Sequence, residues 1–234
     1  MASRDGSTSD VWDVAAPSYD VQRSHDPVYV SCTALAVAST GRHGGTVLDA
    51  GCGTGLTTIP LLRRHDRVIA LDYSFEALWR LAWKRGGRNV LRVRADMHNL
   101  PFRDGTFDAV LCANTLQHMR PGRSQAEVAR ELVRVARRKA RVVVTVHHYS
   151  RDKQRLGWIK EGKPGQAGID YIFRFTRADL AAIFPRARIS AMGFRNAARI
   201  PRIAPPIQRV LARVIGRLAA RRGSGHMLLA RFRK

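Results

Sequence analysis

The chain has 234 residues, which suits one α/β domain of ordinary size with at most a small addition. No apolar run approaches the roughly 18 residues that a membrane-spanning helix needs, and the polar N-terminus MASRDGSTSD lacks the apolar centre of a signal peptide. Three cysteines at unrelated spacings, Cys32, Cys52 and Cys112, exclude a disulfide framework and a zinc-ligand pattern. We therefore expect a reduced, cytoplasmic protein without a metal site.

The charge is distributed unevenly along the chain. Residues 1–120 hold 14 basic and 12 acidic side chains, whereas residues 121–234 hold 27 and 6, a net charge of +21. No acidic residue follows Asp179. This balance favours an anionic partner for the C-terminal half, and it leaves a membrane surface, an acidic substrate and RNA open as alternatives.

Helices and strands alternate over the first two thirds of the chain. Asp26 and Pro27 are typical of an N-cap and a first helical position, and they predict a helix that runs to about Ser39. Short apolar runs predict five strands, at 46–50, 67–71, 90–95, 107–113 and 140–146. Further helices are predicted at 56–64, 74–85 and 124–137. The alternation predicts βαβ units around a parallel sheet that is covered on both faces.

Capping residues support two of these helices. Ser74 is expected to cap the helix that it begins, and Ser124 with Glu127 is expected to form a capping box.

The C-terminal third departs from the alternation. After a glycine-rich loop at 150–170, Thr176–Phe184 predicts a short helix with Thr176 and Asp179 in capping positions. Two more strands are predicted at 187–192 and 227–233. Between them, residues 207–222 place apolar side chains at helical spacing, with Arg209, Arg213 and Arg217 mostly on the opposite face. Such an amphipathic helix either packs on the domain or lies on an anionic membrane or acidic partner.

Three glycines follow the first predicted strand, in the stretch GTVLDAGCGTGLTT. Parallel α/β sheets bind their ligands outside the carboxyl ends of the strands, where this loop lies. Gly51, Gly53 and Gly55 have the spacing G-x-G-x-G, which differs from the dinucleotide fingerprint G-x-G-x-x-G, and no G-K-[ST] follows. Because neither a hydride carrier nor a nucleoside triphosphate fits, a nucleoside without phosphates remains.

Acidic residues lie at the ends of the first three strands. Asp49 could hold an amino group through water or backbone. Asp72 is placed to accept hydrogen bonds from both ribose hydroxyls. Asp96 is placed to accept one from the exocyclic amine of a base, with Met97 beside it to pack on the ring.

Four segments together resemble the class I S-adenosylmethionine-dependent methyltransferases over roughly residues 45–148: VLDAGCGTG, ALDYS, RADMHNLPFRDGTFDAVLCANTLQHM and ELVRVARRKARVVVTV. The resemblance implies an α/β fold, a Rossmann-like doubly wound seven-stranded sheet in the order 3-2-1-4-5-7-6 with strand 7 antiparallel, flanked by helices. It also implies S-adenosyl-L-methionine as cofactor and S-adenosyl-L-homocysteine as product. The cofactor-binding residues that it implies are Asp49, Gly51, Cys52, Gly53, Gly55, Asp72, Tyr73, Asp96, Met97 and Asn114.

We expect a single methyltransferase domain over residues 1–234. Residues 10–40 would form N-terminal helices and a lid, residues 45–148 the cofactor-binding core, and residues 149–234 the substrate side with the basic C-terminal part.

Candidate catalytic groups come from the lid and from the ends of strands four and five. Tyr19 lies in WDVAAPSYD, an entry segment that family members with such a segment fold over the cofactor. His118 follows Asn114 by four residues. His147 and His148 end the fifth strand and would point to opposite faces. A histidine would suit an oxygen acceptor that needs a base, whereas an amine acceptor needs only its neutral form.

The prediction is therefore a methyltransferase that acts on a nitrogen or oxygen atom of a small-molecule or peptide metabolite of the natural-product type. The basic C-terminal half leaves a tRNA or rRNA methyltransferase open, and a non-catalytic accessory subunit that binds S-adenosylmethionine is the third alternative. We expect the protein in the cytoplasm, or peripherally at a membrane if the basic helix binds lipid.

Overall fold

The computed structural model describes residues 9–24, 26–41, 44–163, 171–193 and 225–234. Its main sheet has seven strands in the order β3-β2-β1-β4-β5-β9-β8. The strands are β1 Thr46–Ala50, β2 Arg67–Asp72, β3 Leu91–Arg94, β4 Phe107–Ala113, β5 Ala136–His147, β8 Arg188–Met192 and β9 Met227–Arg233. Strands β1 to β5 pair in parallel, whereas β9 is antiparallel to both β5 and β8. The predicted order and its antiparallel last strand are confirmed.

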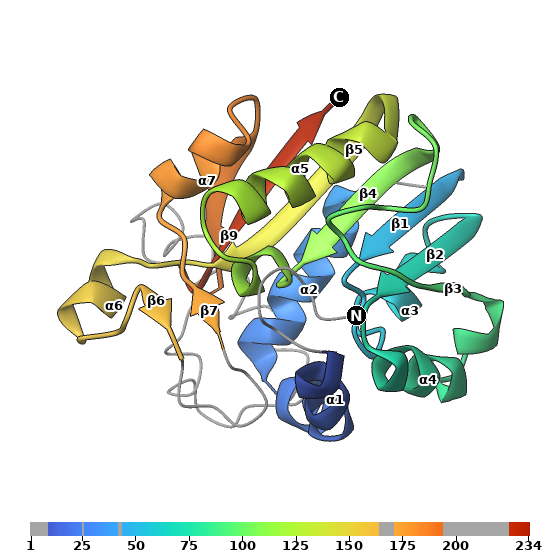
Figure 1. The fold of residues 1–234 in the computed structure, drawn as a ribbon, viewed down its shortest axis with the longest axis horizontal. Helices are drawn as coiled ribbons and strands as arrows, with labels where there is room; N and C mark the ends of the chain where they lie inside the picture. The colour runs from blue at the N-terminus through green and yellow to red at the C-terminus, as the bar shows by residue number, and fades with distance from the viewer. Residues whose placement is uncertain (1–8, 25, 42–43, 164–170, 194–224) are drawn as a thin grey trace.

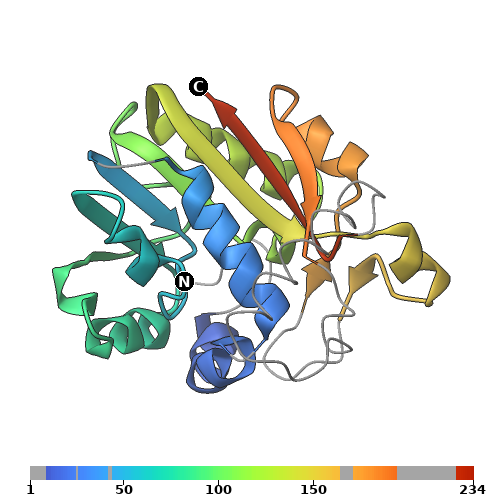
Figure 2. The ribbon, with the colours of Figure 1, turned by 180° about the vertical axis from the view of Figure 1, so that it is seen from behind.

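Helices cover both faces of the sheet (Figures 1 and 2). One face carries α2 (Pro27–Ser39), α3 (Thr58–Leu61) and α4 (Phe75–Trp83), and the other carries α5 (Arg123–Val135) and α7 (Arg177–Ile183). The core is accordingly divided into two apolar clusters, one on each face. Val47 and its neighbour Leu48 are both fully buried, yet they belong to different clusters. Successive strand residues point to opposite faces, so a strand covered on both sides is apolar throughout.

The remaining elements lie at the edges of the sheet. Helix α1 (Ser9–Ser24) lies beyond the carboxyl ends of the parallel strands (Figure 1). Short 3-10 turns are found at η1 (Gly87–Asn89) and η2 (Leu116–His118). The glycine-rich segment that we expected to be a loop contains α6 (Arg151–Arg155) and β6 (Glu161–Gly162), and β6 pairs with β7 (Ile172–Phe173).

Three of the predicted caps are confirmed. Asp26 caps α2 by accepting hydrogen bonds from the backbone of Val28 and Tyr29, at 2.8 and 3.1 Å. Ser74 caps α4. Thr176 and Asp179 form a reciprocal capping box at the start of α7.

The capping box predicted for Ser124 and Glu127 is wrong. Helix α5 begins at Arg123 after Gly122, and no side chain caps it. The Ser124 hydroxyl is instead 2.7 Å from Nε2 of His98, and Glu127 accepts a hydrogen bond from Arg123. Both side chains therefore have partners that compete with the backbone of the first turn.

Two element lengths also differ from the prediction. Helix α3 covers only Thr58–Leu61, because Gly55 turns the chain with a φ of +90° and the Thr57 and Thr58 hydroxyls bind Asp49. Strand β5 begins at Ala136, directly after α5. Its residues 137–139 are exposed and basic, so no apolar run announces them.

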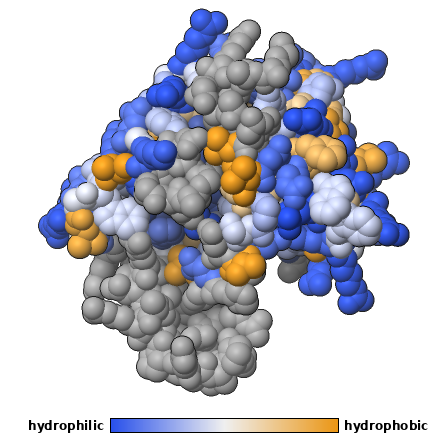
Figure 3. All heavy atoms as spheres, turned by 60° about the horizontal axis from the view of Figure 1, so that its bottom comes forward, coloured by the Kyte–Doolittle hydropathy of each residue, from blue (hydrophilic) through white to orange (hydrophobic). Residues whose placement is uncertain are grey.

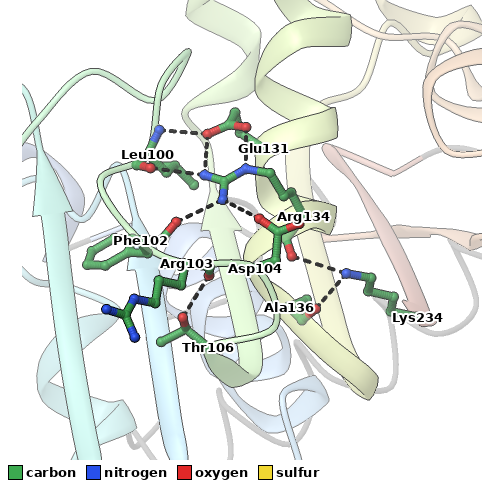
Figure 4. A network of polar contacts seen from close by, with 9 residues as sticks. All are labelled: Leu100, Phe102, Arg103, Asp104, Thr106, Glu131, Arg134, Ala136 and Lys234. Atoms are coloured by element: carbon green, nitrogen blue, oxygen red, sulfur yellow. Dashed lines mark hydrogen bonds and ion pairs between the residues drawn. The ribbon is translucent and has the colours of Figure 1, made fainter.

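A polar network fastens α5 to the loop before β4 at the edge opposite the carboxyl ends (Figure 4). The Arg134 guanidinium donates to the carbonyls of Leu100 and Phe102 and to the carboxylates of Glu131 and Asp104. Such forked, charge-assisted bonding fixes the position of both segments.

The predicted amphipathic helix at 207–222 lies outside the described residues. Among the residues that the structure describes, no helix is long and apolar enough to cross a membrane.

Candidate cofactor and acceptor site

A cavity lies at the carboxyl ends of β1, β2 and β4, where α1 covers it. The glycine loop after β1 forms its floor. Asp72 and Asp96 line it from the ends of β2 and β3, and Asn114 from the end of β4. The α1 side chains that line it are Trp12, Ala15, Ala16 and Tyr19. Eight of the ten predicted cofactor residues meet in this cavity, since Asp49 and Gly55 alone are not in its lining.

The glycines of the loop have different physical roles. Gly51 has a φ of +71°, and a Cβ on it would lie 2.3 Å from the Thr115 side chain. A Cβ on Gly55 would lie 2.3 Å from Leu81 of α4. Gly53 has no heavy atom within 4 Å of the place of a Cβ, and it lines the cavity. The outer glycines thus allow close packing of the protein, whereas the middle one leaves open backbone against which a ligand can lie.

Asp72 is held in place by backbone on both carboxylate oxygens. Its Oδ2 accepts from the Gly53 amide at 2.7 Å, and its Oδ1 accepts from the Ser74 amide at 3.0 Å. Burial raises the pKa of this carboxyl above its ordinary value. Because an ionised carboxylate oxygen accepts more than one hydrogen bond, both oxygens retain capacity for the two hydroxyls of a ribose.

Asp96 and Met97 line the cavity together with His98, which sequence reasoning missed. Oδ1 of Asp96 lies 2.7 Å from Nδ1 of His98, and Nε2 of His98 lies 2.7 Å from the Ser124 hydroxyl. A carboxylate only accepts, so Nδ1 carries a proton and donates it to Asp96, while Nε2 is hydrogen-bonded to the Ser124 hydroxyl. The chain Asp96–His98–Ser124 therefore fixes the Asp96 carboxylate. The sequence signal that could have placed His98 near Asp96 was the Asp two positions before it. An Asp side chain often accepts a hydrogen bond from the backbone amide two residues further on, as Asp96 does from His98.

Asp49 is fully buried beneath the glycine loop, outside the cavity lining. Its Oδ2 accepts from the hydroxyls of Thr57 and Thr58, at 2.8 and 2.7 Å. Its Oδ1 is buried and has no hydrogen-bond partner among the described residues. Burial raises the pKa of Asp49 to about 6. The partnerless Oδ1 is compatible with the expected hold on an amino group through water or backbone.

The part of the cavity between α1 and α2 is aromatic. Tyr19 of α1 and Tyr29 of α2 both line it, and their hydroxyl oxygens lie 3.0 Å apart. The Arg23 guanidinium lies over both rings, 5.7 and 5.4 Å from their centroids. Asn114 lines the same cavity in a left-handed conformation with a φ of +58°. Tyr29 and Arg23 were not predicted as site residues.

His118 also lines the cavity, next to Trp12, with ring centroids 4.6 Å apart in an edge-on arrangement. Its Nδ1 lies 2.9 Å from the carbonyl oxygen of Tyr171. Since a carbonyl can only accept, Nδ1 is protonated and Nε2 keeps a lone pair. Burial lowers the pKa of His118 to about 4, so the ring is neutral at neutral pH.

His147 and His148 are not in the cavity lining. The His147 ring lies 5.4 Å from the His226 ring, and burial lowers the pKa of His147 well below its ordinary value. Nδ1 of His148 donates to the carbonyl of Gly225 at 3.0 Å, and burial lowers the pKa of His148 to about 4. His148 thus joins β5 to the segment before β9, which is a structural contact.

Two aspartates attach α1 to the rest of the site. Asp13 accepts from the Ser74 hydroxyl and from the Glu76 amide at the start of α4. Asp20 accepts from the Thr54 hydroxyl at 2.5 Å and forms an ion pair of 2.7 Å with Lys84. Helix α1 is therefore bound to both ends of α4 and to the glycine loop.

The three cysteines are all buried and free. Burial raises the pKa of the Cys32 and Cys112 thiols to about 12, which makes them unreactive. Cys52 lines the cavity, and burial also raises the pKa of its thiol. No group of three or more His, Cys, Asp or Glu side chains placed to hold a metal is present among the described residues.

The sheet order, the open glycine loop and the two carboxylates at the ends of β2 and β3 have the arrangement of the class I S-adenosylmethionine-dependent methyltransferases. Residues 48–144 match the family model of the methyltransferase domain. The cofactor of the family, S-adenosylmethionine, is the ligand that the cavity fits.

Two related proteins and one solved structure show what the chain is similar to. The demethylmenaquinone methyltransferase of Thermobifida fusca is 37% identical over 114 residues, which are 47% of this chain and 47% of that protein. The cypemycin N-terminal methyltransferase of a Streptomyces species is 46% identical over 67 residues, which are 29% of this chain and 27% of that protein. The matches thus span about half or less of these relatives.

The solved structure of the 1,6-didemethyltoxoflavin-N1-methyltransferase of Burkholderia thailandensis, with bound S-adenosylhomocysteine, superposes with a TM-score of 0.65. It covers 100% of this chain and 92% of that chain at 21% identity, so the likeness concerns the fold.

Proposed function

We propose that the protein transfers the methyl group of S-adenosylmethionine to a nitrogen or oxygen atom of a small-molecule or peptide acceptor. One observation carries the proposal: a neutral imidazole, His118, whose Nε2 has only a long contact of 3.4 Å with the Gln117 side-chain nitrogen, lines the same cavity as Asn114 and the Tyr19–Tyr29 pair. An acceptor bound there would lie between hydrogen-bonding groups and the cofactor end of the cavity.

The cofactor supplies a methyl group on a sulfonium, which a nucleophile displaces in line. The protein's contribution to such a reaction is alignment and exclusion of water, and alignment alone can be worth ~7–11 kcal/mol. Trp12, Ala15 and Ala16 of α1 cover the cavity with mostly apolar surface, which supports the exclusion of water. Asp72 and Asp96 would hold the ribose and the adenine, so that the reactive end lies toward Asn114.

The role we assign to His118 is orientation of the acceptor. Nδ1 already donates to Tyr171, so Nε2 is the accepting atom, and an O–H or N–H of the acceptor would replace its long contact with the Gln117 amide at 3.4 Å. A pKa of about 4 makes the ring a weak base at neutral pH. It is thus better suited to hold the nucleophile and to take its proton as the methyl group arrives than to deprotonate it beforehand.

Arg23 makes this end of the cavity electropositive. It forms no ion pair with an acid among the described residues, and it lowers the pKa of both His118 and His147. A carboxylate of the bound molecules, from the cofactor or from the acceptor, would complement this charge.

The names of the relatives support the acceptor classes that we propose. A demethylmenaquinone is a small molecule, and the N-terminus of cypemycin is a peptide amine, and each is the acceptor only of the protein named after it. A labelled-donor screen against host extract, divided into small molecules, peptides, lipids and RNA, tests the proposal. Label should enter the small-molecule or peptide fraction and be lost with Asp72→Ala. Label that enters RNA alone, or no fraction while the donor binds, would contradict it.

A further inference from the structure

Helix α4 carries a row of aromatic side chains on its outer face that no described part of the protein covers. Phe75, Trp79 and Trp83 follow one another at four-residue spacing, so they lie on one face of the helix. Their exposed fractions are 58%, 47% and 67%. The two indole rings are 5.7 Å apart. Contiguous exposed apolar side chains of this size are rare on soluble proteins and mark interaction sites.

Helix α4 lies at the edge of the sheet. It packs against η1 and β3, and β3 is the first strand of the sheet, with a neighbour only on the β2 side. We call the three residues Phe75, Trp79 and Trp83 the aromatic surface. None of them lines the cofactor cavity.

Unpaired positive charge borders the aromatic surface. Four arginines near α4 are exposed and form no ion pair with a described acid. Arg85 follows the C-cap of α4, Arg88 is in η1, and Arg92 and Arg94 are in β3. The Arg88 guanidinium lies 6.0 Å from the Trp83 ring centroid. The nearby acids are already neutralised, because Glu76 pairs with Arg80 and Asp20 pairs with Lys84, each at 2.7 Å.

The same composition is visible on the molecule. Figure 3 shows the end that carries the cavity, and on the side where Figure 1 labels α4, residues of intermediate and apolar hydropathy lie among strongly hydrophilic ones. The whole chain adds a net charge of +23.

We propose that the aromatic surface docks on an anionic lipid bilayer, with Trp79 and Trp83 at the level of the headgroups and the bordering arginines on lipid phosphates. Indole rings prefer the boundary between headgroups and acyl chains, because they offer apolar area and one polar N–H. Arginines next to them gain from the negative surface potential. The proposal does not depend on the acceptor or on methyl transfer.

The observations favour lipid over other partners. The three rings project from the outer face of α4, so they can insert into a lipid interface. Within the described part of the chain, they do not line a groove that would receive a side chain of a partner protein. The Phe75 ring carries no polar atom and is 58% exposed, so it adds to apolar burial in lipid. Four unpaired cations in one border also oppose pairing of this face with a second copy of the chain.

The test is flotation of the full chain with vesicles of phosphatidylcholine alone and of phosphatidylcholine with phosphatidylglycerol. We expect binding to the anionic vesicles only, with a blue-shifted tryptophan emission. Trp79→Ser/Trp83→Ser should weaken the partition coefficient by at least about tenfold, because two half-exposed rings no longer leave water. Arg85→Gln/Arg88→Gln should weaken it by roughly fivefold for each charge removed.

Matched controls lie on α6, away from the aromatic surface. Leu156→Ser removes a side chain that is 72% exposed, and Arg151→Gln/Arg155→Gln removes two exposed charges. Both should bind vesicles like the unchanged chain, and all variants should keep its melting temperature and its affinity for S-adenosylhomocysteine.

Three results would overturn the proposal. Binding that survives in the tryptophan variant would assign the lipid contact to another part of the chain. Equal loss in the α6 charge variant would show that only total charge matters. Absence of vesicle binding, together with tryptophan quenching by RNA, by an acidic protein or by self-association, would assign the aromatic surface to that partner.

Discussion

The Thr54 hydroxyl donates to the Asp20 carboxylate at 2.5 Å, and this bond joins the glycine loop to the helix that covers the cavity. Thr54 is buried and lines the cavity, and Asp20 also pairs with Lys84 of the α4 C-cap. The floor and the roof of the cofactor site thus touch each other directly. We therefore expect ligand entry and release to involve this contact.

Loss of the contact should speed cofactor release. Thr54→Val keeps the shape of the side chain and removes the hydroxyl donor, which costs ~1 kcal/mol of the closed state. We expect dissociation of S-adenosylhomocysteine to become about fivefold faster by stopped-flow fluorescence. Thr106→Val is the matched control, because Thr106 donates to the Arg103 carbonyl at the opposite edge of the sheet. An unchanged rate in Thr54→Val would show that release does not require α1 to move.

Asp72 should carry much of the cofactor affinity. Asp72→Ala removes the partner of both ribose hydroxyls and should cost at least ~2 kcal/mol of S-adenosylmethionine binding by calorimetry. It also removes the acceptor of the Gly53 amide, so the melting temperature should fall as well. Asp108→Ala, which likewise removes a carboxylate that accepts from a backbone amide, is the control and should lower stability alone. NADH and ATP should not compete in either protein.

Asp49 should make stability depend on pH in the acidic range. Its pKa is about 6 in the folded chain and 3.8 ordinarily, so the folded state holds the proton more tightly. Stability should therefore be greatest below pH 3.8 as far as this group is concerned, and fall as pH rises to about 6. Asp49→Asn removes the buried charge and should flatten this part of a denaturation profile.

The same variant tests the electrostatic role of Asp49. We expect Asp49→Asn to weaken the cationic S-adenosylmethionine more than the S-adenosylhomocysteine, which lacks the sulfonium charge. If Asp49→Asn has the same pH profile as the unchanged chain, the pKa of Asp49 is not raised by folding and the carboxyl is more solvated than its burial indicates. Equal losses for both ligands would confine its role to the shape of the loop.

The sequence predicted the sheet order well, and it also predicted that Asp72 and Asp96 lie together, because both follow from local patterns. Apolar runs mark strands that are buried on both faces, and acids at the ends of β2 and β3 meet because parallel strands end at one edge. Asp72 and Asp96 could therefore be placed in one cavity before any coordinates were known.

The aromatic part of the cavity, where we propose that the acceptor binds, was predicted less well, because it is assembled from distant segments. Tyr29 reaches the cavity only because α2 lies beside α1, and the Nδ1 of His118 is bound by Tyr171, which is 53 residues away. Ser124 followed a good capping pattern, but tertiary contact with His98 prevailed over it. The aromatic surface was not recognised, since an exposed row on α4 has the same spacing as a buried one.

His118 and His148 should differ in what their loss affects. His118→Asn keeps a donor close to the position of Nδ1 for the Tyr171 carbonyl, but it removes Nε2 from the cavity. With an acceptor found in the extract screen, turnover should fall by about 10²-fold, while affinity for S-adenosylhomocysteine stays within about threefold. His148→Asn should leave the turnover of the folded enzyme unchanged, because His148 binds Gly225 and lies outside the cavity lining.

The pH profile gives an independent check on His118. Because its pKa lies at about 4 in the folded chain and at 6.5 ordinarily, it stays neutral when folded, and its share of stability is lost as pH falls from 6.5 toward 4. Turnover in the unchanged enzyme should show no step from this ring near its ordinary pKa. If a step is found there and vanishes in His118→Asn, the ring titrates as a general base and is more solvated than its burial indicates. If His118→Asn instead unfolds the chain or abolishes donor binding, the ring belongs to the structure of the site and not to the handling of the acceptor.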